Sequence, residues 1–221
     1  TMSFDMGQEL AEMDGIEVGR VVINDDVAVK DSLYTVGRRG VAGNFFVMKA
    51  CGAASEEGKT LKELVSIGSQ VVDVTRTMGM ALTGCTPPAK GTPIFTLAED
   101  EMEIGIGIHG EPGRKRVPLQ PANKIVDELF EAVADDLPYK EGDEVALMIN
   151  GMGGTPLAEL YILYGHAHEL CEKRGLKVKR NYVGNYCTSL EMQGFSLTLV
   201  KLNDELERLL AAPAEIAVRI F

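Results

Sequence analysis

The sequence predicts an α/β protein whose sheet is at least partly mixed. Segments rich in valine and isoleucine alternate with segments in which apolar residues recur every three or four positions, and this alternation is typical of α/β folds. Some neighbouring strand segments have no helical segment between them, so we expect antiparallel pairs beside parallel ones. With 221 residues and 45% apolar content, the chain can bury the core of one large domain or two small ones.

The first part of the chain contains one expected strand and one clear helix. Residues 17–24 (EVGRVVIN) are rich in valine and isoleucine and run into Asn-Asp-Asp, which favours a strand followed by a polar turn. Residues 60–79 (TLKELVSIGSQVVDVTRTMG) predict a helix, because Thr60 and Glu63 form a capping box and apolar positions share one face. A loop rich in proline and glycine follows, and we place a domain boundary near residue 79.

The second part alternates helices and strands. Thr155 and Pro156 fit the N-cap and the first position of a helix. The expected elements are a helix near 121–135, a strand at 144–150, a helix from about 156 to 173, strands at 176–183 and 195–202, and a short terminal helix.

Composition excludes several classes of function. The net charge of −11 and a pI near 4.8 argue against nucleic-acid binding, which usually needs a basic stripe. No apolar run reaches the roughly 18 to 20 residues that cross a bilayer, and no signal-peptide pattern opens the chain, so we expect a cytoplasmic protein. The four cysteines have no metal-ligand spacing, and we expect reduced thiols and no metal site.

The motif EMEIGIGIHGEPG, residues 101–113, presents a histidine next to a turn. If the chain is extended there, Glu103, Gly107 and His109 lie on one face, opposite a face of methionine and isoleucine. Glycine within a strand marks a place where a ligand or another backbone comes close. Imidazole can act as a base, ligand or nucleophile near neutral pH, and Glu103 or Glu111 could orient the ring.

Spacing alone leaves a structural alternative for this motif. Pro112 and Gly113 match the central residues of a type II turn, so His109 could equally be a hydrogen-bonded turn residue. His166 and His168 are two positions apart on a helix and do not share a face, so we expect surface or packing roles for them.

Three other features have both a functional and a structural interpretation. Residues 150–160 (NGMGGTPLAEL) join a strand to a helix N-terminus through glycines and could meet an anion, but they form no P-loop, and a tight connection is the alternative. Asp25 and Asp26 could bind a metal, although a solvated strand end is favoured. Basic clusters at 114–116 and 173–180 predict solvated faces, the first near enough to His109 to meet a phosphorylated ligand or acidic partner.

Several segments together resemble the dihydroxyacetone-binding subunit, or domain, of dihydroxyacetone kinases (the DhaK family). They run in order along nearly the whole chain: 23–54, 101–113, 150–161 and 184–202. In that family the histidine of the G-I-H-G-E-P-G motif adds through its ring nitrogen to the ketone carbon of the substrate. The resemblance therefore implies a covalent hemiaminal on His109. Gly107 and Glu103, which share its face if the chain is extended, are the further substrate-binding candidates.

The resemblance also implies a fold of two unlike domains. One is a three-layer α/β/α domain with a largely parallel sheet, and the other is a two-layer α/β domain with a mixed sheet. On this division, residues 1–79 are the carboxy-terminal part of the first domain, which is only partly present, and residues 80–221 are the second domain, which carries the histidine motif.

One departure from the family concerns the amino-terminal side. Family members begin with roughly a hundred further residues, which carry a G-G-G-S-G-H-E-P motif and an acidic residue thought to act as base. Aligned on His109, that acidic residue would fall immediately before Thr1. The chain is therefore a fragment or a naturally shortened relative, and we favour the fragment because residues 1–79 resemble half of a sheet domain.

The resemblance implies a kinase role shared with other polypeptides. We expect this chain, as a homodimer, to hold dihydroxyacetone for phosphorylation by a separate subunit that carries ADP or ATP and Mg, and we expect no cofactor on this chain. A phosphoenolpyruvate-driven relay is favoured over ATP as direct donor, because no nucleotide-binding domain follows Phe221. The alternatives are a non-catalytic regulator that binds a transcription factor or a kinase subunit, and a kinase for another short ketose such as erythrulose.

Overall fold

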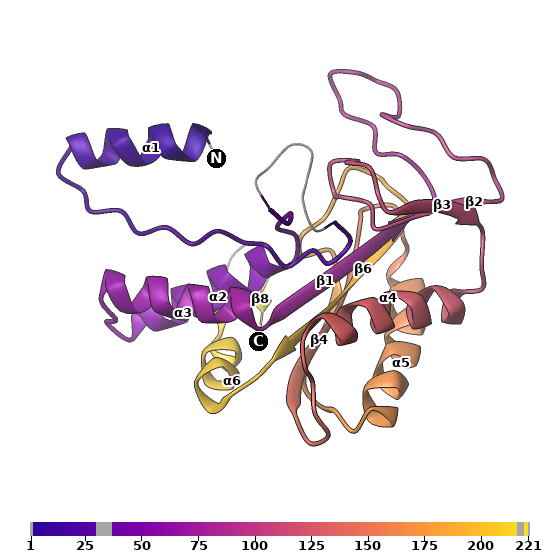
Figure 1. The fold of residues 1–221 in the computed structure, drawn as a ribbon. Helices are drawn as coiled ribbons and strands as arrows, with labels where there is room; N and C mark the ends of the chain where they lie inside the picture. The colour runs from indigo at the N-terminus through magenta and orange to yellow at the C-terminus, as the bar shows by residue number, and fades with distance from the viewer. Residues whose placement is uncertain (1, 30–36, 216–218, 221) are drawn as a thin grey trace.

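The computed structural model describes residues 2–29, 37–215 and 219–220, and it is an α/β fold built on one six-stranded sheet (Figure 1). Part of the first segment that carries the family resemblance, residues 30–36, lies outside the described residues. The strands are β1 (Thr75–Ala81), β2 (Glu101–Ile104), β3 (Lys115–Pro118), β4 (Glu144–Gly151), β5 (Lys177–Gly184), β6 (Gly194–Lys201), β7 (Ala214–Glu215) and β8 (Arg219–Ile220). The helices are α1 (Met2–Met13), α2 (Gly43–Glu56), α3 (Leu61–Asp73), α4 (Ala122–Asp136), α5 (Leu157–Lys173) and α6 (Asp204–Ala211).

The sheet is mixed, as expected. Its strand order is β3-β2-β1-β6-β4-β5, and β7 pairs with β8 separately. Within the six-stranded sheet, β4 and β5 are parallel and are connected through α5, whereas the other neighbouring strands are antiparallel. A parallel pair needs such a crossover, whereas antiparallel pairs do not, and this explains why helices separate only some of the strands.

Helices cover both faces of the sheet. Because side chains alternate along a strand, Val145, Leu147 and Ile149 of β4 pack in the core beneath α4 and α5, whereas Ala146 and Met148 pack in the core beneath α2, α3 and α6. All five side chains are fully buried. A strand buried on both faces reads as a continuous apolar run, which is what residues 145–149 show.

The helix expected over residues 60–79 is correct at its start and too long at its end. Thr60 is the N-cap, and the reciprocal hydrogen bonds with Glu63 form the expected capping box. The helix α3 ends at Asp73, and β1 begins at Thr75. The expected boundary near residue 79 lies inside β1, where Gly79 pairs with β6, so both sides of it contribute to one sheet. The division into two domains stays a prediction.

The strand expected at residues 17–24 is wrong. Residues 16–25 have no strand pairing, and only Asp26 forms an isolated parallel bridge, with Thr77 of β1. The segment is rich in β-branched residues, which favour strands. However, no strand among the described residues lies beside it, and a strand needs a partner for its backbone hydrogen bonds. Figure 1 shows this segment leading away from the sheet to α1, which lies apart from the other helices.

The remaining predicted elements agree with the structure within a few residues, whereas α1 and α2 have no counterpart in the sequence prediction. The exception concerns the start of α5, where Pro156 and not Thr155 is the N-cap. The Thr155 hydroxyl instead donates to the Gly194 carbonyl oxygen at 2.7 Å and accepts from the Gly194 N–H at 2.9 Å. Thr155 therefore joins the start of α5 to β6.

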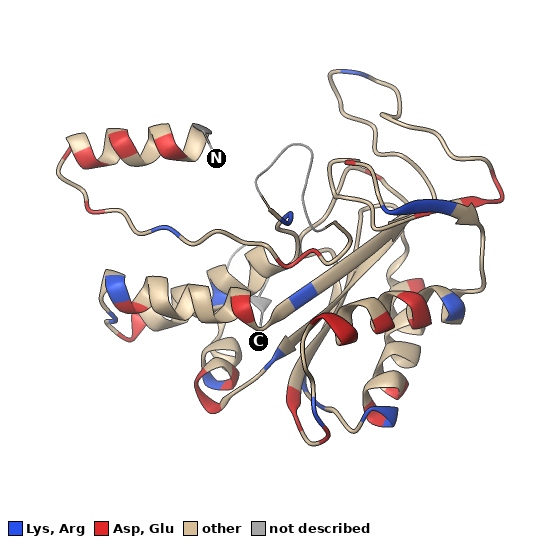
Figure 2. Cartoon of the chain, viewed as in Figure 1, with Lys and Arg blue, Asp and Glu red and all other residues tan. Residues whose placement is uncertain are grey.

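Acidic and basic residues are spread along the helices, strands and loops (Figure 2). The basic clusters at 114–116 and 173–180 are largely engaged in ion pairs: Lys115 with Glu128, Arg116 with Glu103, Arg174 with Asp135, Lys179 with Glu144 and Arg180 with Glu207. Among the described residues, no helix combines the length and apolar character needed to cross a bilayer.

Candidate functional site

The candidate site is the loop from Gly105 to Gly113, between β2 and β3. The strand expected through His109 is wrong, because β2 ends at Ile104 and Gly105 has a φ of 81°, a left-handed value that favours glycine. The Gly105 N–H donates to the carbonyl oxygen of Gly79 in β1 at 2.6 Å, and the Arg114 N–H donates to that of Ile104 at 2.7 Å. Both ends of the loop are therefore tied to the sheet.

A tight turn places the histidine at the tip of this loop. The Gly107 N–H donates to the Glu111 carbonyl oxygen, and the Gly110 N–H donates to that of Gly107. Gly110 has a φ of 79°, whereas Gly113 is not left-handed. The type II turn expected at Pro112 and Gly113 is therefore wrong, since such a turn requires a positive φ at its third position.

His109 is exposed, and one carboxylate holds it. Its side chain is 79% exposed, and Nδ1 lies 3.0 Å from Oε1 of Glu111. The other carboxylate oxygen, Oε2, accepts the backbone N–H of His109 at 3.0 Å. Gly107 makes room for this carboxylate, because a Cβ at residue 107 would lie 2.2 Å from Oε2. The structure therefore brings together His109, Gly107 and Glu111.

The charge on Glu111 determines which ring nitrogen of His109 carries the proton. Burial favours the neutral acid, but the hydrogen bonds that the carboxylate accepts outweigh burial and lower the pKa of Glu111. An ionised carboxylate can only accept, so the Nδ1 atom of a neutral His109 ring carries the proton. The lone pair then lies on Nε2, for which the described residues provide no hydrogen-bond partner.

Glu103 lies under the loop and does not contact His109. Its side chain is 8% exposed. Its carboxylate accepts the backbone N–H of Gly113 at 2.7 Å and pairs with Arg116 at 3.2 Å. These contacts fix the carboxy-terminal end of the loop, and any role of Glu103 toward a substrate stays a prediction.

A small apolar cluster supports the loop from below. Two loop residues pack in it with side chains from the β1–β2 connection and from the loops after β4 and β5, and the cluster consists of Ala81, Cys85, Ile94, Phe95, Ile106, Ile108, Met152 and Met192. Gly110 has a left-handed φ, and a Cβ there would lie 1.9 Å from Cδ1 of Ile94, so a larger residue would be strained and would displace the Ile94 side chain. The tip of the loop is therefore seated on apolar packing, with the His109 ring outside it.

Asp25 and Asp26 are buried, which overturns the expectation of a solvated strand end. Asp25 accepts the backbone N–H groups of Val41 and Gly43 and thereby caps α2, whose own N-cap residue makes no side-chain bond. Burial raises the pKa of Asp25, and it raises that of Asp26 to about 6 although Arg39 opposes the shift. Sequence inspection missed Arg39, because nothing in GRRG distinguishes it from its neighbour.

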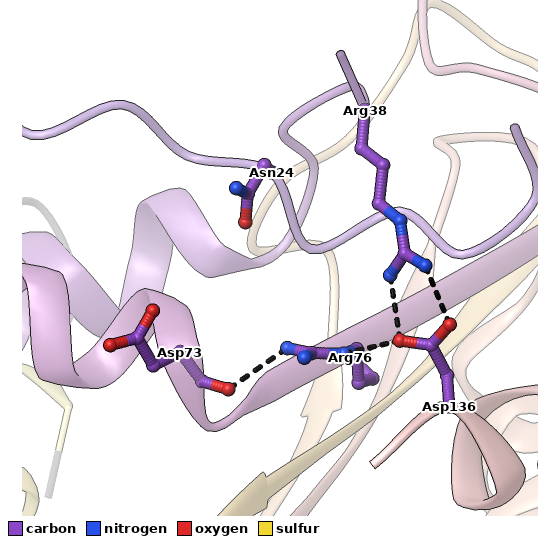
Figure 3. A pocket seen from close by; sticks show the side chains of 5 residues that line it. All are labelled: Asn24, Arg38, Asp73, Arg76 and Asp136. Carbon is purple, nitrogen blue, oxygen red and sulfur yellow. Dashed lines mark hydrogen bonds and ion pairs between the residues drawn. The ribbon is translucent and has the colours of Figure 1, made fainter. Parts of the chain in front are cut away.

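A second polar site lies between α3, β1 and α4 (Figure 3). Its cavity, of about 350 Å³, is lined by Asn24, Arg38, Asp73, Arg76 and Asp136. Figure 3 shows both arginines directed at Asp136, with Arg38 bonded through two nitrogens at 2.6 Å and Arg76 through Nε at 2.6 Å. The bond from Arg38 is the main cause of the lowered pKa of Asp136.

The other sequence candidates have structural partners. His166 lies 2.7 Å from Asp127 and joins α5 to α4, and His168 lies 3.9 Å from Glu172. At the glycine-rich connection, the Asn150 side chain bonds to the backbone of residues 186 and 187 and links β4 to the loop after β5. Within the part of the chain that the structure describes, no three histidine, cysteine or acidic side chains gather as a metal site would require.

Comparison with known proteins gives one consistent result. The model of the Dak1 domain matches residues 1–218. The PTS-dependent dihydroxyacetone kinase 1, dihydroxyacetone-binding subunit DhaK, of Listeria innocua is 47% identical over 92% of this chain. The PEP-dependent dihydroxyacetone kinase, dihydroxyacetone-binding subunit DhaK, of Escherichia coli is 42% identical over 96% of it. This chain spans 62% and 66% of the length of these two relatives.

A solved structure agrees with this result. The dihydroxyacetone kinase operon co-activator Dha-DhaQ superposes with a TM-score of 0.87 at 34% identity, over 95% of this chain and 65% of the other.

Proposed function

The chain belongs to the Dak1 domain family, and from this premise we propose that it is the substrate-binding part of a dihydroxyacetone kinase, with His109 as the covalent anchor. The observation that supports this proposal most directly is an exposed ring whose Nδ1 atom faces an ionised carboxylate and whose Nε2 atom has no partner among the described residues. An imidazole in this state offers a nucleophile to a carbonyl compound that arrives from solvent.

The reaction conserves all atoms of the ring and the ketone. The Nε2 lone pair forms a bond to the ketone carbon, the π pair of the carbonyl moves to its oxygen, and that oxygen takes up a proton. The Nδ1 proton leaves toward Glu111 or water, so the ring is again neutral in the hemiaminal. Glu111 stabilises the positive charge that the ring carries between these proton transfers.

Binding by this reaction selects the substrate by its chemistry. A ketone such as dihydroxyacetone forms the adduct, whereas glycerol has no carbonyl carbon and is excluded. Phosphoryl transfer in this proposal belongs to a separate subunit that carries ADP or ATP with Mg, and a phosphoenolpyruvate-driven relay is favoured as the phosphate source. The names of the two DhaK relatives, PTS-dependent and PEP-dependent, support that part of the proposal. We further propose a homodimer located in the cytoplasm.

The test is detection of the adduct on the protein that contains this chain. Dihydroxyacetone labelled with ¹³C at the carbonyl carbon should lose its ketone signal on binding and give the signal of a tetrahedral carbon. The variant His109→Gln should bind no label and should keep its thermal midpoint, because the ring is exposed. An unmodified ketone signal at saturating dihydroxyacetone would refute the proposal.

A regulatory protein is the second candidate. The likeness to a co-activator of the dihydroxyacetone kinase operon favours it, and such a protein would bind a transcription factor or a kinase subunit without supporting catalysis. The distinguishing measurement is formation of dihydroxyacetone phosphate in the presence of the nucleotide-binding subunit and a phosphate donor. Turnover supports the kinase role, whereas adduct formation without turnover supports the regulator. Comparison of dihydroxyacetone with erythrulose in the same assay identifies the preferred ketose.

A further inference from the structure

The loop that carries His109 is held at both ends by one arginine from another part of the chain. Arg39 donates from Nη2 to the Gly105 carbonyl oxygen at 2.6 Å and from Nη1 to the Pro112 carbonyl oxygen at 3.1 Å. Gly105 is the first residue of the loop, and Pro112 comes just before its end. A planar guanidinium has donors at fixed angles, so these two bonds act together with the backbone bonds of Gly105 and Arg114 to fix the two ends of the loop relative to each other.

Arg39 is itself held in place within the core. Its side chain is 9% exposed, and Nε donates to Oδ2 of Asp26 at 2.7 Å. The other oxygen of Asp26 accepts the Ala28 N–H at 2.9 Å, and the backbone beside it pairs with Thr77 of β1. The chain of contacts therefore runs from the central strand through Asp26 and Arg39 to the loop.

The segment that carries Arg39 is fixed a second time by the neighbouring aspartate. Asp25 is fully buried and accepts the N–H groups of Val41 and Gly43, at 2.8 and 3.0 Å. Two consecutive buried aspartates thus determine where residues 39–43 lie. Buried carboxyl groups are costly unless they are paired or hydrogen-bonded; Asp26 pairs with Arg39, and Asp25 accepts the two backbone N–H groups.

We propose that Arg39, supported by Asp26, is a positioning residue for His109 that sets the geometry in which the ring meets a carbonyl compound. The His109 ring has no core contact of its own, so its position follows from the loop that carries it. This inference rests on the proposed function for its substrate, but its structural part can be tested without one. Loss of the guanidinium should let the ends of the loop move apart, while β1 and the helices keep their packing.

The test compares two adjacent arginines in the full-length protein. Arg39→Lys keeps the positive charge but cannot bond Asp26, Gly105 and Pro112 together. Arg38→Lys is the matched control. It also removes a guanidinium that bonds an acceptor through two nitrogens, but that acceptor is the Asp136 carboxylate and not the loop. The measurements are the affinity for ¹³C-labelled dihydroxyacetone, the thermal midpoint, and the hydrogen-exchange rates of the loop amides.

We expect Arg39→Lys to weaken adduct formation by roughly tenfold or more, since two bonds from a charged donor are lost, and to speed exchange at Gly107 and Gly110. Arg38→Lys should change adduct affinity by less than about twofold at a comparable midpoint. If Arg39→Lys does not fold, the double variant Arg39→Met with Asp26→Asn removes both charges and should show the same loss of affinity.

The positioning role of Arg39 and the proposed function can fail independently, and different results would show each failure. A folded Arg39 variant with the affinity and loop exchange of the Arg38 control would overturn the positioning role. A wild-type protein that forms no adduct would refute the proposed function. The exchange rates at Gly107 and Gly110 would then decide the positioning role on their own, because faster exchange in Arg39→Lys alone would support it and equal exchange in both variants would overturn it.

Discussion

Replacing Glu111 by glutamine tests the proposed chemistry of the histidine with little change in shape. The glutamine oxygen can still accept the His109 backbone N–H, but its amide group can also donate to Nδ1, which would move the ring proton to Nε2 and remove the nucleophilic lone pair. The loss of one hydrogen bond to a charged acceptor is about 1.5–3 kcal/mol, or about 10- to 160-fold in the affinity for dihydroxyacetone.

Calorimetric titration of the full-length protein with dihydroxyacetone measures this effect. Glu111 is 29% exposed and its bond to the backbone can persist, so we expect the free energy of unfolding to fall by less than about 1 kcal/mol. Glu128→Gln is a control for the loss of a carboxylate elsewhere, because among the described residues the ion pair of Glu128 is with Lys115 and not with His109. An affinity within about twofold of wild type in Glu111→Gln would refute the tautomer argument.

Three further substitutions test the framework of the site. Gly107→Ala places a Cβ 2.2 Å from Oε2 of Glu111, so affinity for dihydroxyacetone should fall at least about tenfold in titration; unchanged affinity would show that the carboxylate position is unimportant. Asp136→Asn should lower the free energy of unfolding by about 1–3 kcal/mol in urea at pH 7. Because its pKa is lowered in the folded state, this contribution is present at neutral pH and should disappear as the pH falls below about 4; a constant difference between variant and wild type would contradict it. Thr155→Val removes two hydrogen bonds to Gly194 and should lower the free energy of unfolding by about 1–3 kcal/mol in the same assay. An unchanged free energy of unfolding would show that water replaces these bonds.

Local patterns in the sequence were sufficient for most of the fold. The capping box at Thr60, the apolar period of α4 and the apolar run of β4 each agree with the structure, because the signal lies within the element itself. The end of α3 could not be located in this way. Thr75 continues the helical period, but its backbone pairs with Val200 of β6, so the strand is decided by a partner that lies far away in sequence.

The candidate site was also predicted only in part, because some of its contacts lie within one motif and others join distant segments. The motif identified His109, and Glu111 proved to be its partner among the two glutamates considered. The expected strand failed at Gly105, where a left-handed φ ends the alternation. Burial of Asp26 and the contacts of Arg39 depend on residues brought together from three separate segments, and no spacing rule within one segment reports them.

The strand order has a consequence for how the protein acquires its site during synthesis. The Gly105 end of the loop is bonded to Gly79, and Gly79 pairs with Ser196 of β6, which leaves the ribosome long after the histidine does. Contacts between distant segments form late, since the chain between them must first be closed. A nascent chain that stops before β6 would therefore lack the strand that pairs with β1 behind the loop, and it would expose that unpaired edge of β1 to other chains. The proposed reactivity of His109 toward ketones should consequently be complete only in the last stage of folding, together with protection from aggregation.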